Sequence, residues 1–245
     1  MMHSSKEKLS IGWCDNGMVD GKFAEGIVYT TLLAPTIGVP VANAMRVQGN
    51  QIGRQRQALF DLWYDSVKTD WLLWVDSDIV LDQNILKMLW DAADRQTKPV
   101  VCGVYFISKQ NEAPVMQPMP AVFNEVDEFT IQYLHPLPEN QLIEIDNAGL
   151  GLCLMHRSVV DKLREAYPGV SMFAEQEGVG DKYVSEDIVF FRKLKSVGVK
   201  VYAHTGALVK HMKRFALDVN YYKMWWHYAQ LTQQPVEQEK LPEEK

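Results

Sequence analysis

Hydrophobic residues along this chain follow two patterns, continuous runs and helical repeats. Residues 71–75 and 100–107 are almost unbroken apolar runs, which are typical of strands buried on both faces of a parallel sheet. Between them, residues 82–94 carry apolar side chains at the spacing of one helix face, namely Ile85, Met88, Leu89 and Ala92. This strand–helix–strand order predicts parallel pairing through right-handed crossovers.

The same patterns extend the arrangement along the chain. We expect further strands over 9–14, 41–47, 142–155 and 199–203, and further helices over 22–33, 50–65, 158–167 and 185–196. Asn50, Asp82 and Ser185 stand where a side chain can cap three of these helices. Together the segments predict an α/β fold, with a mostly parallel central sheet flanked by helices.

Three regions depart from this regular alternation. Residues 108–144 contain five prolines and only short alternating strands, which indicates an irregular insert that faces a substrate. Residues 169–183 are expected to form a mobile loop. At the C-terminus we expect an aromatic-rich helix over 213–232 and a disordered tail over 233–245. The expected organisation is therefore a single domain over residues 1–232.

Composition narrows the class of protein. The formal net charge of −6 over 245 residues, with no basic cluster, argues against a nucleic-acid partner. The three cysteines are far apart and form no CxxC pair, so we expect reduced thiols in a cytoplasmic protein. The first ten residues lack the apolar core of a signal peptide, and no apolar run is long enough to predict a transmembrane segment.

The first candidate for chemistry is the acidic pair that follows the apolar run at 71–75. Asp76 and Asp78 stand at the carboxyl end of this expected strand, where ligands bind in open α/β sheets. Two carboxylates so close together repel each other unless a cation lies between them, and a hard divalent cation suits them. The alternative is that both are solvated turn residues.

A second acidic pair, Glu186 and Asp187, opens the helix expected over 185–196. Acidic residues in a first helical turn often only complement the helix dipole. This helix, however, carries Ile188, Phe190 and Phe191, which anchor it on the core. Such a helix start can hold a carboxylate rigidly as a general base.

Three further features are less specific. His211 is either a metal ligand or a structural histidine, and Arg56 either binds a phosphate or forms a surface ion pair. The segment 146–151 combines Asp146 with Gly149 and Gly151, and glycines allow a ligand to approach the backbone closely.

The order of these features, taken together, resembles the GT-A glycosyltransferases, and within them the family 2-like enzymes. The resemblance covers residues 9–212. The matching segments are Arg54-Gln55-Arg56-Gln57, Leu73-Trp74-Val75-Asp76-Ser77-Asp78, residues 146–155, Glu186-Asp187-Ile188-Val189-Phe190-Phe191-Arg192, Gly198-Val199-Lys200-Val201 and His211. Two departures stand out: Arg56 is followed by Gln57 where the family has Asn, and the first strand ends in Cys-Asp-Asn-Gly.

The resemblance implies an enzyme that moves a sugar from a nucleotide-sugar donor, a UDP- or GDP-sugar, to an acceptor hydroxyl with inversion. Asp78 and His211 would hold Mn2+ or Mg2+, with Asp76 facing the metal and the ribose. Asp187 would be the catalytic base, with Glu186 beside it. The residues implied to bind the donor are Trp13, Asp15, Arg56, Asp76, Ser77, Asp146, Gly149 and Gly151.

Other functions fit parts of the sequence. Val75-Asp76-Ser77-Asp78 also resembles the first motif of haloacid-dehalogenase-like phosphatases, in which Asp76 would be the nucleophile. That motif normally ends the first strand of its fold, whereas here two strands are expected before it. A nucleotidyltransferase would need a glycine-rich phosphate loop after the first strand. A GT-A module that binds sugar without catalysis is the third alternative.

Overall fold

The computed structural model of the chain describes residues 7–109, 117–180, 182–214 and 218–232. The chain divides into two compact units. The described residues within 7–107 and 119–212 form the first unit, and those within 108–118 and 213–232 form the second. The tail expected over 233–245 lies outside the described residues.

A seven-stranded sheet is the centre of the first unit. Its strand order is β10-β15-β5-β12-β3-β1-β2, and the strands are listed here with their bounds: β1 (Leu9–Asp15), β2 (Val41–Gln48), β3 (Trp71–Val75), β5 (Val100–Val104), β10 (Leu142–Ile145), β12 (Leu152–His156) and β15 (Val201–Leu208). β1, β2, β3, β5 and β15 run in one direction, and β10 and β12 run in the other. The predicted mostly parallel sheet is confirmed.

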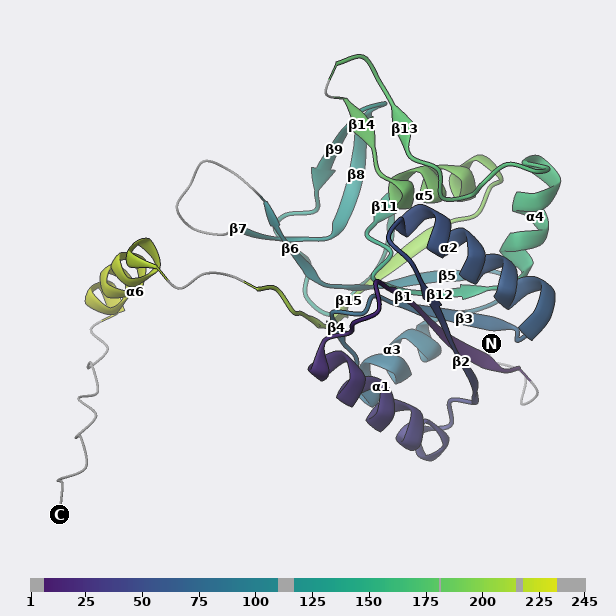
Figure 1. The fold of residues 1–245 in the computed structure, drawn as a ribbon, viewed down its shortest axis with the longest axis horizontal. Coiled ribbons are helices and arrows are strands. Elements are labelled where there is room, and N and C mark those ends of the chain that lie inside the picture. Colours follow the sequence, from purple (N-terminus) through teal and green to yellow (C-terminus); the bar gives the residue numbers. More distant parts are fainter. Residues whose placement is uncertain (1–6, 110–116, 181, 215–217, 233–245) are drawn as a thin grey trace. The chain divides into compact units, whose positions relative to one another are not determined.

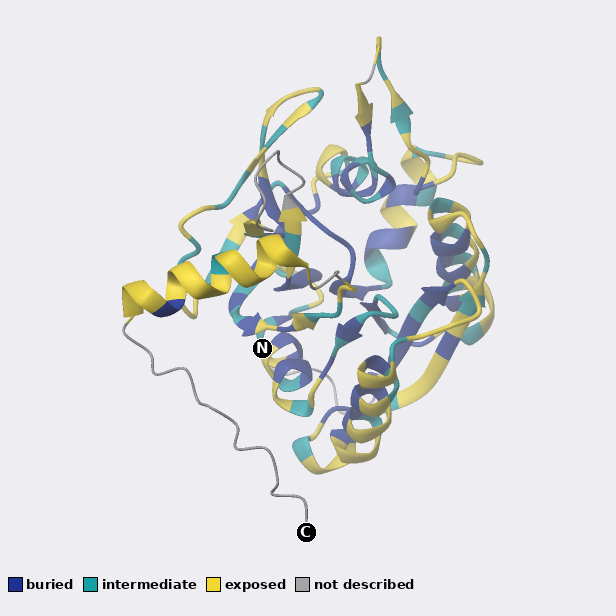
Figure 2. Ribbon diagram, turned by 60° about the vertical axis from the view of Figure 1, so that its left-hand side comes forward, coloured by how far each residue is buried: buried dark blue, intermediate teal, exposed yellow. Residues whose placement is uncertain are grey.

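The run at 71–75 is continuous because both faces of β3 are covered. Leu72 and Trp74 pack into the hydrophobic cluster on one face, and Trp71, Leu73 and Val75 pack into the cluster on the other. Helices α1 (Gly21–Leu33) and α3 (Gln83–Ala92) cover one face of the sheet, and α2 (Ile52–Asp61), α4 (Ser158–Ala166) and α5 (Glu186–Ser196) cover the other (Figure 1). Buried residues accordingly concentrate on the sheet and on the helix faces turned toward it (Figure 2).

Of the three residues predicted to cap helices, Asp82 does so, whereas Asn50 and Ser185 do not. Asp82 caps α3 as expected, because its carboxylate accepts hydrogen bonds from the N–H groups of Asn84 and Ile85. α2 begins at Ile52, so Gln51 and not Asn50 precedes it, and the expected helix over 50–65 ends as a π-helix, η2 (Leu62–Val67). Ser185 precedes α5, but its side chain makes no capping hydrogen bond.

The region 108–144 is more regular than its prolines predict. Strands β8 (Val122–Asp127) and β9 (Thr130–Tyr133) pair with β11 (Asn147–Ala148) in a three-stranded sheet. Short pairs are formed by β4 (Ile79–Val80) with β16 (Lys210–His211), by β13 (Gln176–Glu177) with β14 (Tyr183–Val184), and by β6 (Phe106–Lys109) with β7 (Gln117–Pro120). The apolar run 100–107, which predicted a single strand, is divided between two strands: β5 ends at Val104 and β6 begins at Phe106.

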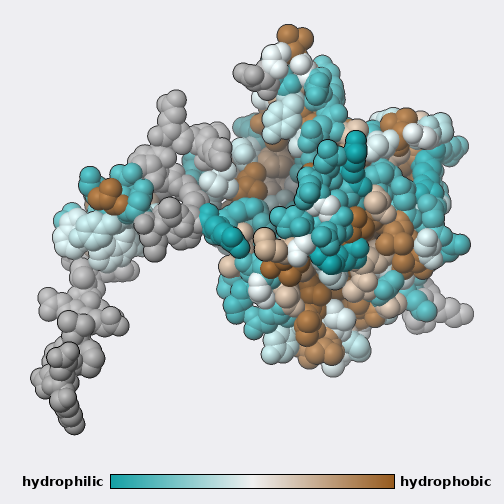
Figure 3. All heavy atoms as spheres, viewed as in Figure 1, coloured by the Kyte–Doolittle hydropathy of each residue, from teal (hydrophilic) through white to brown (hydrophobic). Residues whose placement is uncertain are grey.

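The outer face of α1 is apolar as well as its inner face. Phe23, Ile27 and Thr30 are buried. On the opposite side, Val28 and Leu32 are exposed, and brown apolar atoms reach the surface there, at the lower edge of Figure 3. The two faces of α1 therefore differ little in polarity, although the helix packs against the sheet in the usual way for an α/β fold.

The C-terminal helix α6 (Val219–Thr232) begins later than the 213–232 that we expected and belongs to the second unit. Its aromatic side chains are largely exposed, and Ala229 is its only buried residue. Among the described residues, no helix is long and apolar enough to cross a membrane.

Gly53 allows α2 to pass close to the loop that carries Phe173. A Cβ atom at Gly53 would lie 2.3 Å from the carbonyl oxygen of Phe173. Gly53→Ala is therefore expected to lower the free energy of unfolding by about 1–3 kcal/mol, although alanine favours a helix. Gly21→Ala is the matched control, because a Cβ there meets nothing within 4 Å, and it should be neutral or stabilising. Chemical denaturation measures both, and equal effects would contradict the close approach.

Candidate functional site

The turn after β3 places two carboxylates at the carboxyl end of the sheet. The N–H of Asp76 donates to the carbonyl oxygen of Gly151 at 2.9 Å, and the N–H of Ile79 donates to the carbonyl oxygen of Asp76 at 2.9 Å. The N–H of Asp20, which precedes α1, donates to the carbonyl oxygen of Ser77 at 3.0 Å. The turn is thus fixed by hydrogen bonds at three points, and Asp76 and Asp78 have defined positions.

His211 lies beside Asp78 because β16 pairs with β4. In this pairing His211 stands opposite Ile79, and the N–H of Met212 donates to the carbonyl oxygen of Asp78 at 2.7 Å. Nε2 of His211 is 3.1 Å from Oδ2 of Asp78, and Nδ1 is 2.9 Å from the carbonyl oxygen of Phe106. The structure therefore brings together two of the expected metal ligands from positions 133 residues apart in the sequence.

The hydrogen bond to the carbonyl oxygen of Phe106 determines which ring nitrogen of His211 carries the proton in the neutral ring. A carbonyl oxygen only accepts, so Nδ1 carries the proton that it shares with Phe106. In the neutral ring, Nε2 then directs a lone pair at the carboxylate of Asp78. Two acceptors at this distance require a proton or a cation between them. A histidine whose other nitrogen donates to a carbonyl group is the arrangement commonly found around bound metals.

Arg56 of α2 joins two acidic residues inside the site. Its side chain is only 6% exposed; one nitrogen donates to Oε1 of Glu186 at 2.6 Å, and another donates to Asp76 at 3.3 Å. Burial by itself lowers the pKa of Arg56, but the charges of Asp76, Asp187 and Glu186 outweigh burial and raise the pKa above its ordinary value. Arg56 is thus a buried permanent cation and not the surface residue of the alternative interpretation.

Glu186 and Asp187 have different environments at the start of α5. Burial raises the pKa of Glu186; Arg56 opposes this shift, and Asp187 adds to it. Oδ1 of Asp187 accepts hydrogen bonds from the hydroxyl of Ser185 and from the N–H of Ile188. Within the described residues its other oxygen, Oδ2, takes part in no hydrogen bond. Glu186 is therefore held by an ion pair, and Asp187 is a positioned carboxylate with one oxygen available.

Tyr105 is a site residue that the sequence analysis missed. It follows β5, is 6% exposed, and its ring packs edge-on against His211 with 5.1 Å between the ring centres. A Cβ at Gly149 would lie 1.9 Å from its hydroxyl oxygen, and a Cβ at Gly151 would lie 2.9 Å from its ring. Both glycines thus make room for Tyr105. In the sequence, Tyr105 was only one more residue of the apolar run 100–107.

Two of the other residues expected to bind the donor, Trp13 and Asp15, form a hydrogen-bonded group with Arg46. The carboxylate of Asp15 is fully buried, and it accepts hydrogen bonds from Arg46 at 2.6 and 2.7 Å, from Gly17 at 2.7 Å and from Trp13 at 3.2 Å. The hydrogen bond from Arg46 is the main reason why the pKa of Asp15 lies below its ordinary value. Asp15 is therefore not accessible to a ligand, whereas the guanidinium of Arg46, near the end of β2, is partly exposed and can contact one.

Asp146 belongs to a further polar group. It pairs with Lys195 and accepts a hydrogen bond from the N–H of Glu125 at 3.0 Å. Glu125 in turn pairs with Arg192 at 2.7 Å. The contacts of Asp146 thus connect α5 with the three-stranded sheet.

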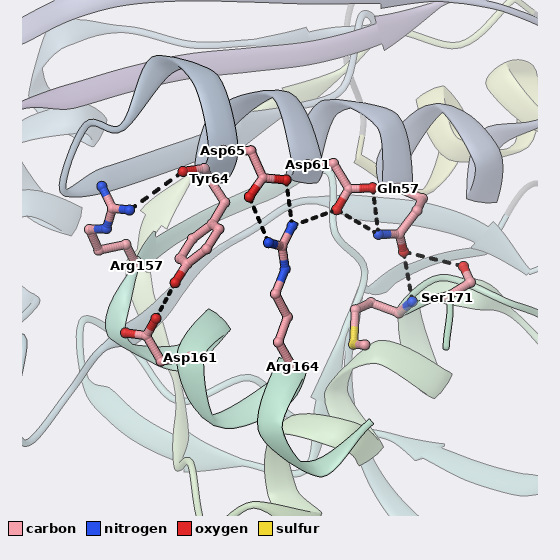
Figure 4. Close-up of polar contacts among 9 residues, drawn as sticks. Gln57, Asp61, Tyr64, Asp65, Arg157, Asp161, Arg164 and Ser171 are labelled. Carbon is pink, nitrogen blue, oxygen red and sulfur yellow. Dashed lines mark hydrogen bonds and ion pairs between the residues drawn. The ribbon is translucent and has the colours of Figure 1, made fainter. Parts of the chain in front are cut away.

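Gln57, which stands where the resembling family has Asn, anchors the loop expected to be mobile over 169–183. Its Oε1 accepts a hydrogen bond from the N–H of Met172 at 2.7 Å, and its Nε2 donates to Asp61 at 3.1 Å (Figure 4). Met172 and Phe173 are buried, and Phe173 stacks on Phe190 with 4.6 Å between the ring centres. The first part of this loop is therefore fixed on the core.

The residues present suit a divalent cation that is completed by a ligand. Among the described residues, no three histidine, cysteine or acidic side chains converge into a preformed metal cage. Asp78 and His211 supply two donors whose 3.1 Å separation matches the distance of about 3 Å between neighbouring ligands of a small octahedral cation. Mg2+ is commonly bound by one or two protein side chains together with substrate phosphates.

Comparison with known proteins bears on the fold. No protein-family model matches this sequence, and no curated protein matches it. The structure is similar to that of A197 from STIV, with a TM-score of 0.50 and 17% identity over 84% of this chain and 86% of that one. It is also similar to GalNAc-T7, crystallised with UDP, GalNAc and Mn2+, with a TM-score of 0.50 and 10% identity. That match covers 85% of this chain and 43% of the GalNAc-T7 chain. The chain has the GT-A fold.

Proposed function

We propose that this chain, with its GT-A fold, is a metal-dependent glycosyltransferase that moves a hexose-like sugar from a UDP- or GDP-sugar to an acceptor hydroxyl, with inversion. The observation that carries the proposal is the meeting of Asp78, His211, Asp76 and Asp187 at one end of the sheet. Asp76 follows the third strand of the fold, which argues against the phosphatase alternative, because that motif ends a first strand.

In this proposal Asp78 and His211 hold Mn2+ or Mg2+. The bound cation would neutralise the diphosphate and stabilise the charge that develops on the leaving nucleotide. The hydrogen bond from Nδ1 to Phe106 keeps Nε2 of His211 directed toward that position. Arg56 lies between Asp76 and Glu186 and bonds to both carboxylates, which reduces the repulsion between them.

Asp187 removes the proton from the acceptor hydroxyl in this proposal. The hydroxyl of Ser185 and the N–H of Ile188 hold Oδ1, which leaves Oδ2 for the acceptor. Glu186 is buried and paired with Arg56, so it positions Arg56 and does not act as a second base. We further propose that Trp13, Arg46 and the turn at Ser77 lie on the nucleotide side.

A thermal-shift screen tests the proposal. UDP, GDP and their sugars are added with Mn2+ and with EDTA, and release of UDP or GDP from the sugars is measured in parallel. A ligand at one hundred times its Kd stabilises the fold by about 2.7 kcal/mol. A metal-dependent shift together with nucleotide release supports the proposal. Release of phosphate from a generic phosphoester, or binding without any turnover, contradicts it.

His211→Ala is expected to weaken Mn2+-dependent binding of UDP or GDP at least about tenfold, because it removes one of two protein ligands. His135→Ala is the control, since His135 is an exposed histidine of the same unit. Calorimetric titration of each variant with the nucleotide and Mn2+ measures the change. Wild-type affinity in His211→Ala would show that the cation is held elsewhere.

A further inference from the structure

Tyr105 has a buried hydroxyl close to the residues of the site. It lies between β5 and β6, where its oxygen is 3.4 Å from the N–H of Gly151. A Cβ at Gly151 would also lie 3.0 Å from Oδ2 of Asp76. The hydroxyl of Tyr105 and the carboxylate of Asp76 thus meet at the same glycine.

The proton of this hydroxyl meets no acceptor among the residues that the structure describes. The N–H of Gly151 only donates, so it occupies a lone pair of the tyrosine oxygen and leaves the O–H unused. Within the described part of the chain, no carboxylate or carbonyl oxygen accepts a hydrogen bond from Tyr105. A buried donor without an acceptor is costly, and it points to a bound molecule that supplies the acceptor.

The charges around Tyr105 indicate which part of the donor it meets. Two carboxylates, Asp76 and Asp187, and one guanidinium, Arg56, act electrostatically on Tyr105, so the charge around the hydroxyl is negative on balance. In the proposed function, Asp76 faces the metal and Asp187 faces the acceptor. The sugar ring of a donor would occupy the space between these carboxylates, and neutral sugar hydroxyls suit such surroundings better than a diphosphate does.

We propose that the hydroxyl of Tyr105 donates a hydrogen bond to an oxygen of the donor sugar, which makes Tyr105 a residue that selects the nucleotide sugar over the free nucleotide. The inference rests on the proposed glycosyltransferase function. In this arrangement Gly149 and Gly151 act through Tyr105, because they leave the space that its ring and hydroxyl fill.

Tyr105→Phe tests the inference because it keeps the ring against His211 and removes only the hydroxyl. Calorimetry with Mn2+ compares UDP-glucose, UDP-galactose, UDP-N-acetylglucosamine and GDP-mannose with UDP and GDP. For the nucleotide sugar that the wild-type protein binds, we expect affinity to fall about three- to tenfold, the effect of one hydrogen bond. Affinity for the corresponding free nucleotide should stay unchanged. Tyr167→Phe, which removes an exposed hydroxyl bonded to Ser196 at 2.7 Å, should change neither.

The remaining outcomes overturn the inference. An equal loss for nucleotide and nucleotide sugar would assign the hydroxyl to the diphosphate or to the fold, and no loss for either would remove Tyr105 from binding. If the wild-type protein binds no nucleotide at all, the proposed function itself fails.

Discussion

Asp187→Asn is expected to lower the rate of sugar transfer by about a hundredfold to ten-thousandfold, the usual contribution of a general base. Asparagine keeps the size of the side chain and an oxygen for the N–H of Ile188, so the start of α5 should remain intact. The amide cannot take a proton from the acceptor hydroxyl. Initial rates with a saturating donor and Mn2+ measure the effect.

Donor binding separates a base from a metal ligand. Because a base acts on the acceptor, the Kd for the nucleotide and Mn2+ should be unchanged in Asp187→Asn. Asp161→Asn is the matched control, because Asp161 accepts a hydrogen bond from the hydroxyl of Tyr64 (Figure 4) and has no contact with the site residues. Near-normal transfer in Asp187→Asn, or a loss of nucleotide binding, would remove Asp187 from the role of base. Retention at the anomeric carbon would do the same.

Arg56→Met is expected to lower the free energy of unfolding by about 3–5 kcal/mol, because it leaves the buried carboxylate of Glu186 without its cation. Methionine preserves most of the apolar stem. The loss should shrink as the pH falls toward the ordinary pKa of Glu186, 4.5. A folded-state pKa above the unfolded value contributes stability at low pH, and this stability is lost as the pH rises through the folded value.

Arg164→Met is the matched control, because it removes an arginine whose ion pairs are exposed instead of buried. Arg164 makes three hydrogen bonds with Asp61 and Asp65 (Figure 4). Arg56 makes one close hydrogen bond, with Glu186, and two longer ones with Asp76. The side chains of the Arg164 cluster are, however, more than a third exposed, so its removal should cost no more than about 1 kcal/mol. Urea denaturation between pH 4 and pH 7 measures both variants. Equal losses would show that the number of hydrogen bonds matters more here than burial.

The elements that the sequence predicts well are those whose signal is local. The run at 71–75 predicts a strand with two covered faces because each of its residues meets apolar neighbours, and Asp82 marks a helix start because its cap needs only the next turn. The end of α2 was missed because no local pattern marks the π-helical turn, which contacts α4 through the ion pairs of Arg164 with Asp61 and Asp65. The division of the run 100–107 at Tyr105 depends likewise on packing against residues far along the chain.

The candidate site shows the same limit. Its acidic residues and His211 were found because they are chemically distinctive and follow a known order. The residues that contact them were not predicted. Arg46 forms an ion pair with Asp15, and Lys195 forms one with Asp146. Tyr105 fills the space beside Gly149 and Gly151. Each of these pairs joins segments that only the folded chain brings together, and in the sequence each partner is an ordinary residue of a strand or helix.

The position of β12 between β3 and β5 has a consequence for synthesis of the chain. β3 and β5 leave the ribosome early, yet neither pairs with the other, and each needs residues 152–156 on one side. Until that segment has been made, two wholly apolar strands have open edges, which are prone to associate with other chains. Nascent chains that stop before residue 152 should therefore aggregate or recruit chaperones.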